Sequence, residues 1–285
     1  MTCNNALERK KEAYQKHLQE AYEMYQTGDY SITKIAAHLG LDRKFLSKML
    51  KENYPDINIR LNGQKLVDSH IFDNIDTEEK AYWLGFLYAD GYISDGYINN
   101  RVELCIQEDD LPHLENYKKF LKSNHKITIK VIPDGLGGDA FRAVRLTIDN
   151  KDLRAGLVKH GCFNNKSLTI EMPTLNDDLM RHFIRGFFDG DGTIYWHSHR
   201  KSYRAGFCSG SSKFLEQLKE YLKTKDIELC SIIRDTRSIN THNVSVSQTS
   251  LEKFLKYLYE DSTIYLQRKY DKSLAALGQM ATKKS

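Results

Sequence analysis

A repeated pattern limits the folds open to this sequence more than any other feature. In two stretches, YWLGFLYADGYIS from Tyr82 and HFIRGFFDGDGTIYW from His182, an apolar helix ends in an aspartate that is followed by glycine. Four pairs of residues share a separation of 101 positions: Gly85 and Gly186, Asp90 and Asp191, Gly91 and Gly192, and Ile93 and Ile194. This constant offset predicts a duplicated unit whose two copies pack about a pseudo-two-fold axis.

Both copies of the motif are followed by the same order of predicted elements. The first continues with strand GYINNRVELCIQ, helix DDLPHLENYKKFL, strands KITIKVIP and AFRAVRLTID, and helix NKDLRAGLVKHG. The second continues with strands TIYWHS and SYRAGFCS, helix SSKFLEQLKEYL, strands IELCSIIR and NVSVSQ, and helix SLEKFLKYLYE. The periodicities therefore predict an α+β fold of two αββαββα repeats with antiparallel sheets, at residues 77–175 and 176–285.

Small residues in the two motif helices predict that these helices pack closely together. Each helix has two small residues four positions apart: Gly85 with Ala89, and Gly186 with Gly190. Packing does not account for Asp90 and Asp191, because a carboxylate at a helix C-terminus is disfavoured by about 0.3–1 kcal/mol. Two such carboxylates about 4 Å apart would also repel by roughly 4 kcal/mol at an effective dielectric near 20. A divalent cation such as Mg²⁺ would relieve this repulsion.

The segments WLGFLYADG and IRGFFDGDG resemble the two signature helices of the single-chain LAGLIDADG homing endonucleases. The resemblance extends from about Thr77 to the C-terminus. It implies a DNA endonuclease that makes a double-strand break in a long, asymmetric site. It also implies that Asp90 and Asp191 bind the metal, with Mg²⁺ as cofactor and Mn²⁺ as a substitute. Asp189 falls at another acidic position of the motif, but the first copy has Tyr88 there. We therefore do not count Asp189 as a metal ligand shared by the two copies.

The resemblance further implies a basic residue near each cleavage site, late in each repeat. Lys166 lies 76 residues after Asp90, and Lys269 lies 78 residues after Asp191. A lysine at such a site can stabilise the charge that builds on the scissile phosphate, so we predict that both serve catalysis. The alternative is a pair of solvated surface lysines, since most lysines are exposed.

Long polar side chains on the predicted strands, and on the turn HSHRKSY, predict a basic surface that reads the major groove of DNA. The candidate residues are Arg101, Arg142, Arg145, Arg200, Lys201, Tyr203, Arg204, Arg234 and Arg237. For any one of them, the alternative is an ordinary solvated charge.

The first 55 residues predict a separate helix-turn-helix domain, and residues 56–76 predict a linker. In ITKIAAHLGLDRKFLSKMLKENY, Ser31 and Asp42 can cap two successive helices, and Gly40 can make the turn between them. The outward side chains of the second helix are the candidates for groove contacts: Arg43, Lys44, Ser47, Lys48 and Lys51. The alternative is a small helical domain with a charged face.

The composition narrows the surroundings and partners of the chain. The net charge of +4 permits a nucleic-acid partner without requiring one. The five cysteines are scattered without a C-x-x-C pair, which argues against a disulfide framework or a cysteine zinc site and favours a reducing compartment. The N-terminus shows no secretory signal, and no apolar run is long enough to span a bilayer. We therefore expect a cytoplasmic protein. The resemblance to the single-chain endonucleases implies a monomer that binds double-stranded DNA.

Two other functions remain open from the sequence. Some proteins that resemble this family act as maturases, so intron RNA is a second possible partner. The chain could also be a DNA-binding regulator with a degenerate nuclease body. The presence of both Asp90 and Asp191 counts against the regulator.

Overall fold

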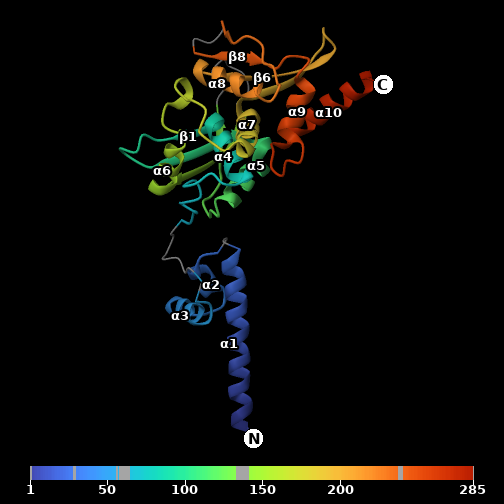
Figure 1. Ribbon diagram of the computed structural model, residues 1–285. Coiled ribbons are helices and arrows are strands. Elements are labelled where there is room, and N and C mark those ends of the chain that lie inside the picture. The colour runs from blue at the N-terminus through green and yellow to red at the C-terminus, as the bar shows by residue number, and fades with distance from the viewer. Residues whose placement is uncertain are drawn as a thin grey trace. The chain divides into compact units, whose positions relative to one another are not determined.

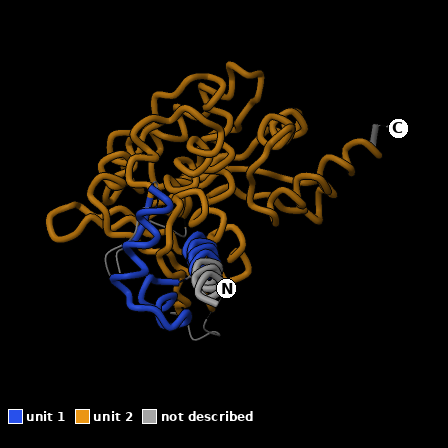
Figure 2. The backbone as a smooth tube through the Cα atoms, turned by 90° about the horizontal axis from the view of Figure 1, so that it is seen from below, with its two compact units in different colours: residues 1–67 blue, residues 68–285 orange. Residues whose placement is uncertain are grey.

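The computed structural model describes residues 2–27, 30–55, 57, 65–132, 141–236 and 240–284. These residues form two compact units, at 1–67 and 68–285 (Figures 1 and 2). Part of the predicted linker, residues 56 and 58–64, lies outside the described residues, and so does the candidate Arg237.

The first unit consists of three helices, α1 (Thr2–Gln26), α2 (Ile32–His38) and α3 (Arg43–Asn53). The Ser31 side chain accepts a hydrogen bond from the backbone N–H of Lys34, and Asp42 accepts one from Phe45, so the two expected caps are present. Gly40 has φ +67°, the left-handed conformation that a tight turn between two helices requires. The buried core of this unit is drawn from all three helices: Leu18, Ala21 and Tyr25, then Ile32, Ile35 and Ala36, then Leu46, Met49 and Leu50.

The second unit contains the two αββαββα halves that the sequence predicts. The first half comprises α4 (Glu78–Asp90), β1 (Gly91–Ile93), β2 (Arg101–Gln107), α5 (Leu111–Phe120), β3 (Thr128–Ile132), β4 (Phe141–Asp149) and α6 (Lys151–Lys159). The second half comprises α7 (Asp177–Asp191), β5 (Gly192–His197), β6 (Ser202–Ser209), α8 (Ser212–Lys223), β7 (Ile233–Arg234), β8 (His242–Ser245) and α9 (Leu251–Tyr259). The predicted fold class is confirmed.

Three elements of the second unit are additions to the predicted pattern. Short 3₁₀ helices η1 (Glu108–Asp110) and η2 (Lys166–Leu168) follow β2 and α6. A last helix, α10 (Gln267–Lys284), follows α9 and carries the candidate Lys269. The edge strand β7 has only two residues, so it is shorter than the sequence pattern indicates.

Each half contains one four-stranded antiparallel sheet, with the orders β1-β2-β4-β3 and β5-β6-β8-β7. Helices α4, α5 and α6 pack on the first sheet, and α7 and α8 on the second. Along β2, the buried residues Val102, Leu104 and Ile106 alternate with more exposed ones. Each sheet therefore has one face packed on helices and one open face, as antiparallel sheets allow.

Helices α4 and α7 lie side by side at the centre of the second unit (Figure 1). A Cβ atom added to Gly85 would lie 2.0 Å from the carbonyl oxygen of Phe183, and one added to Gly186 would lie 1.9 Å from that of Tyr82. The two backbones are therefore in direct contact at the glycines, as the spacing of small residues predicts.

Two further observations concern the cysteines and the hydrophobicity of the helices. Among the described residues, Cys105, Cys162, Cys208 and Cys230 are free thiols. None of the helices in the described ranges is both long enough and apolar enough to cross a membrane.

Candidate active site

The two aspartates that end α4 and α7 meet at the C-terminal ends of these helices. A Cβ atom on Gly190 would lie 2.3 Å from the Ala89 Cβ and 3.2 Å from Asp90 Oδ2. The Asp90 carboxylate is therefore held against the backbone of α7, one residue before Asp191. The structure brings together the two acids that the repeat singles out.

Neither carboxylate is neutralised by a direct contact within the described part of the chain. Asp90 is exposed and Asp191 is partly buried, and neither accepts a hydrogen bond or forms an ion pair there. The surrounding protein desolvates Asp90 and raises its pKa, although part of the side chain reaches solvent; Lys269 and Lys166 oppose this rise. Desolvation, followed by the negative charge of Asp90, raises the pKa of Asp191 to about 7. The two carboxylates thus repel each other when both are ionised.

Asp189 provides a contrast on the same helix. It is fully buried, and its oxygens accept hydrogen bonds from the hydroxyls of Tyr82 (2.8 Å) and Tyr259 (2.6 Å) and from the backbone N–H of Leu266 (2.7 Å). Three donors occupy this carboxylate, so it has a structural role and no free oxygen facing the site. This agrees with its exclusion as a shared ligand.

The two candidate lysines contact the backbone directly after the two aspartates. Lys166 Nζ donates to the carbonyl oxygen of Gly91, and Lys269 Nζ donates to that of Gly192 at 2.6 Å. These glycines are equivalent in the repeat, so the lysines are equivalent too. Only 6% of Lys166 and 4% of Lys269 is exposed, so the alternative of solvated surface lysines is wrong. Their positive charges lie where the dipoles of α4 and α7 end, which is favourable for a cation.

The residues at this centre fit a hard divalent cation. The free donors are carboxylate oxygens, the type of ligand that Mg²⁺ prefers. No cluster of three or more histidine, cysteine, aspartate or glutamate side chains suited to a metal occurs among the described residues. Asp90 and Asp191 would therefore hold such an ion together with water and phosphate oxygens, as is common for Mg²⁺.

Comparison with known proteins identifies the family of the second half. The family model described as a LAGLIDADG-like domain matches residues 178–259. The chain carries a LAGLIDADG-like domain. The matched residues run from the start of α7 to the end of α9, so this domain includes Asp191 and the whole second sheet. The family recognised from the motif residues is thus confirmed.

The chain is similar to several solved structures. The homing endonuclease I-WcaI bound to its DNA recognition sequence has 15% identity and a TM-score of 0.50, over 81% of this chain and 92% of that chain. I-DmoI in complex with DNA and Ca has 17% identity and a TM-score of 0.46, over 73% and 97%. Full-length DUF199/WhiA from Thermatoga maritima has 17% identity and a TM-score of 0.46, over 76% and 65%. No curated protein matches the chain.

Strand register separates the candidate DNA-binding residues of the second unit into two faces. Arg101 and Arg145 lie on the open face of the first sheet, where Arg145 is 3.4 Å from Glu103. Arg204 lies on the open face of the second sheet, opposite Tyr195. Arg200 and Lys201 lie in the exposed turn between β5 and β6. These five residues border one open surface in each half.

Three other candidates lie on the opposite faces of their strands. Arg142 shares the parity of the buried residues of β4 and forms a paired contact with Glu108 at 2.6 and 2.8 Å. Tyr203 precedes Arg204 and packs edge-on against Trp196. Arg234 follows Ile233, which pairs with Asn243 on the open side. The alternation of side chains along a strand accounts for this division.

The open faces also carry residues that the sequence reasoning missed. Tyr92 is 49% exposed and Tyr195 is 50% exposed, and both lie on open faces, on the strands that follow the two aspartates. Lys130 on β3 is exposed and in register with Ala143, on the side of Arg145. The two tyrosines could have been found from the sequence, because they lie one and three residues after the motif glycines and therefore on the face opposite to them.

A salt bridge between the two halves is a further feature that the sequence did not reveal. Arg268 on α10 contacts the Asp110 carboxylate of the first half at 3.0 and 3.2 Å. Asp110 is 8% exposed and the Arg268 side chain is 43% exposed, so this contact is only partly shielded from water. It holds the start of α10, and hence Lys269, against the first half.

In the first unit, the candidate residues of α3 gather on one surface. Arg43, Lys44, Ser47, Lys48 and Lys51 line a single open groove together with Glu52. Lys48 forms an ion pair with Glu52 at 3.8 Å, which leaves most of the groove's charge positive. The buried residues of α3 face the other way, so the groove side is free to meet a partner.

The raised pKa of Asp191 predicts a pH-dependent stability of the metal-free protein. The folded state keeps this proton up to about pH 7, whereas the unfolded chain loses it near the ordinary value of 3.8. Between these limits the folded state binds more protons, so raising the pH should lower the free energy of unfolding. In Asp191→Asn this contribution should be absent. Urea unfolding in EDTA at pH 5 and pH 8 measures it, and equal pH dependence in both proteins would contradict the prediction.

Proposed function

We propose that this protein is a site-specific DNA endonuclease of the homing type, which makes a double-strand break in a long, asymmetric target by metal-dependent hydrolysis. The observation that carries the proposal is the pair Asp90 and Asp191, whose oxygens are free and which meet over two equivalent buried lysines. A double-strand break needs one hydrolysis on each strand. The two halves supply one acid and one lysine each, which matches that requirement.

The residues of the site have separate tasks in this proposal. Asp90 and Asp191 hold the metal, and their raised pKa values reflect a site prepared for positive charge. A bound Mg²⁺, which Mn²⁺ is expected to replace, would supply an activated water and neutralise charge on the phosphate. Lys166 and Lys269 contribute positive charge beside the backbone that follows the two carboxylates, which favours the more negative transition state. Both tasks rely on groups fixed before DNA binds.

The open faces of the two sheets are the proposed DNA-binding surface. Arg101, Arg145 and Arg204, with the β5–β6 turn, would contact DNA on either side of the two aspartates. A β ribbon of this kind fits the major groove. I-WcaI, which shares the fold, is bound to its DNA recognition sequence, and this supports the placement. Because one chain contains both acids, we expect a monomer to be the active unit.

Selection of cleaved sequences tests the function directly. A randomised or host-genome DNA pool is incubated with the protein and Mg²⁺, and cut ends are recovered and sequenced. We expect one long, asymmetric site with breaks on both strands. Specific DNA binding without any break would favour a DNA-binding regulator, and specific retention of intron RNA without DNA cleavage would favour a maturase.

The first unit is proposed to bind DNA outside the central site, through the groove of α3. A variant without the four basic side chains of this groove, Arg43, Lys44, Lys48 and Lys51, each changed to Ala, should bind the selected site more weakly. The slope of log affinity against log salt should become shallower by about 0.9 for each phosphate that the variant no longer neutralises. Fluorescence anisotropy over a salt series measures both quantities.

The control removes four lysines from helices that are not proposed to touch DNA. These are Lys16 on α1, Lys213 and Lys223 on α8, and Lys256 on α9, each changed to Ala. Its net charge matches that of the α3 variant. If both variants show the same affinity and slope, the effect comes from total charge, and α3 has another role.

A further inference from the structure

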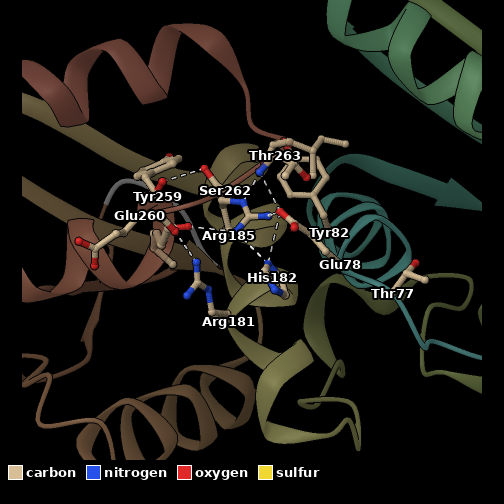
Figure 3. Close-up of polar contacts among 12 residues, drawn as sticks. Thr77, Glu78, Tyr82, Arg181, His182, Arg185, Tyr259, Glu260, Ser262 and Thr263 are labelled. Atoms are coloured by element: carbon tan, nitrogen blue, oxygen red, sulfur yellow. Dashed lines mark hydrogen bonds and ion pairs between the residues drawn. The ribbon is translucent and has the colours of Figure 1, made fainter.

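One face of α7 carries buried charges that the proposed metal site does not use. Arg181, Arg185 and Asp189 follow each other at intervals of four residues, which places them on one side of the helix. Arg185 and Asp189 are fully buried. A buried charge is costly unless it is fully paired, so the contacts of this stripe indicate its role. All three residues contact the segment 258–266, which comprises the end of α9 and its connection to α10. Figure 3 shows the contacts of Arg181 and Arg185.

Arg185 contacts that segment at two points. Its guanidinium donates to the carbonyl oxygens of Leu258 at 3.0 Å and Ile264 at 2.8 Å. It also donates to the carboxylate of Glu78, at the start of α4, at 2.6 Å. The same Glu78 oxygen accepts the backbone N–H of Thr263 at 3.0 Å. Figure 3 shows Glu78 of α4 and Arg185 of α7 in contact with the segment.

Asp189 fixes the last residue before α10. It accepts the backbone N–H of Leu266 and the hydroxyl of Tyr259, at the two ends of the segment, and is linked to α4 by Tyr82. Lys269 follows Leu266 by three residues, in the first turn of α10. The stripe therefore determines where the ammonium group of Lys269 can reach.

The first half lacks this stripe and uses a different tether. The residues 101 positions earlier are Lys80, Leu84 and Tyr88. Of these, Tyr88 donates its hydroxyl to the carbonyl oxygen of His160 at 2.6 Å, at the end of α6. This contact holds the chain six residues before Lys166. The same motif position thus tethers the lysine segment in each half, as a donor in the first and as an acceptor in the second.

The two lysines are held unequally as a result. Lys269 Nζ donates to three carbonyl oxygens, those of Phe188 (2.6 Å), Gly190 (3.0 Å) and Gly192 (2.6 Å). These contacts occupy all three of its N–H groups. Lys166 Nζ donates to the Gly91 carbonyl. The ammonium group of Lys269 is therefore held in one place, and that place depends on α10 being anchored.

We propose that Asp189 and Arg185 are positioning residues for Lys269, that Tyr88 is the positioning residue for Lys166, and that each tether controls cleavage of one DNA strand. The strand assignment rests on the proposed endonuclease function. The positioning of the lysines does not depend on it.

A matched pair of variants tests the proposal, because Tyr259→Phe and Tyr88→Phe each remove a single buried hydroxyl from one tether. Strand-resolved cleavage of end-labelled target DNA is measured for both. We expect Tyr259→Phe to slow one strand several-fold, and Tyr88→Phe to slow the other. Arg185→Leu, which introduces the residue found at position 84, should slow the same strand as Tyr259→Phe, by on the order of tenfold, since small misplacements are costly. Lys80→Leu, at the position equivalent to Arg181, is the control and should leave both strands unchanged.

Lysine labelling gives a second readout that needs no cleavage. The proteins are treated with acetic anhydride without DNA, and acetylation of Lys269 and Lys166 is followed by mass spectrometry. Tyr259→Phe should speed labelling of Lys269 several-fold and leave Lys166 unchanged, and Tyr88→Phe should do the reverse.

Each outcome decides a stated part of the proposal. Equal slowing of both strands by every variant would overturn strand control and indicate a general loss of structure. Unchanged labelling of both lysines would overturn the positioning roles. If the unmodified protein cuts no DNA, the endonuclease function fails, and labelling alone then decides whether the tethers position the lysines.

Discussion

Asp90→Asn and Asp191→Asn are each expected to slow DNA cleavage by about a hundredfold or more, a loss typical of removing one group from a prepared electrostatic site. The reason is that these are the two acids with free oxygens at the centre of the pseudo-two-fold arrangement. An amide keeps the size of the side chain but removes the negative charge that would hold a cation. DNA binding should persist or become tighter, because a repulsive charge near the phosphates is removed.

A nicking assay on supercoiled plasmid that carries the selected site measures this effect. Asp226→Asn is a suitable control, since its carboxylate is 89% exposed and pairs with Lys253 on the protein surface. It should linearise the plasmid at the unmodified rate. Full linearisation at that rate by both Asp90→Asn and Asp191→Asn would contradict the proposed chemistry and favour the regulator.

The duplication could be predicted because its evidence lies in residue spacing. The 101-residue offset fixes the equivalence of the two halves, and the glycines at 85 and 186 indicate where the central helices touch. The meeting of Asp90 and Asp191 follows from these two facts. Backbone contact of this kind depends on the absence of side chains, which a sequence shows directly.

The buried charges could not be predicted in the same way. The ion pair between Arg185 and Glu78 joins residues 107 positions apart. An arginine in an apolar helix has no local feature that distinguishes a buried anchor from an exposed side chain. Its partners on segment 258–266 come from a third part of the chain, so its role emerges only when all three are folded together.

The residues on the open faces of the sheets could be predicted only in part. Side-chain alternation separates Arg145 from Arg142, and Arg204 from Tyr203, once the phase of each strand is known. For β4 the sequence contains that phase, because the apolar residues at 144, 146 and 148 alternate with Arg145 and Thr147. Polarity alone does not separate the two faces of a strand, so the predicted set of DNA-binding residues contains members of both.

Gly85→Ala and Gly186→Ala are expected to destabilise the second unit more than any surface substitution. The added Cβ would lie 2.0 or 1.9 Å from a backbone carbonyl oxygen of the facing helix, and a backbone cannot move aside as a side chain can. We expect a cost of about 3 kcal/mol or more, at the upper end of the range for overpacked cores. In a unit of this size, that corresponds to a fall in Tm of roughly 6–12 °C.

Thermal unfolding followed by tryptophan fluorescence reports on this unit alone, because Trp83 and Trp196 both belong to it. Gly278→Ala on α10 is the matched control: nothing lies within 4 Å of a Cβ at that position. There, alanine should be neutral or stabilising by up to about 1 kcal/mol, because glycine is a poor helix former. Since α4 and α7 also bring the two aspartates together, the destabilised variants should lose cleavage at temperatures where the control retains it. An unchanged Tm in both central variants would mean that the helices can separate without cost, and the close packing would then not be what holds the two halves in register.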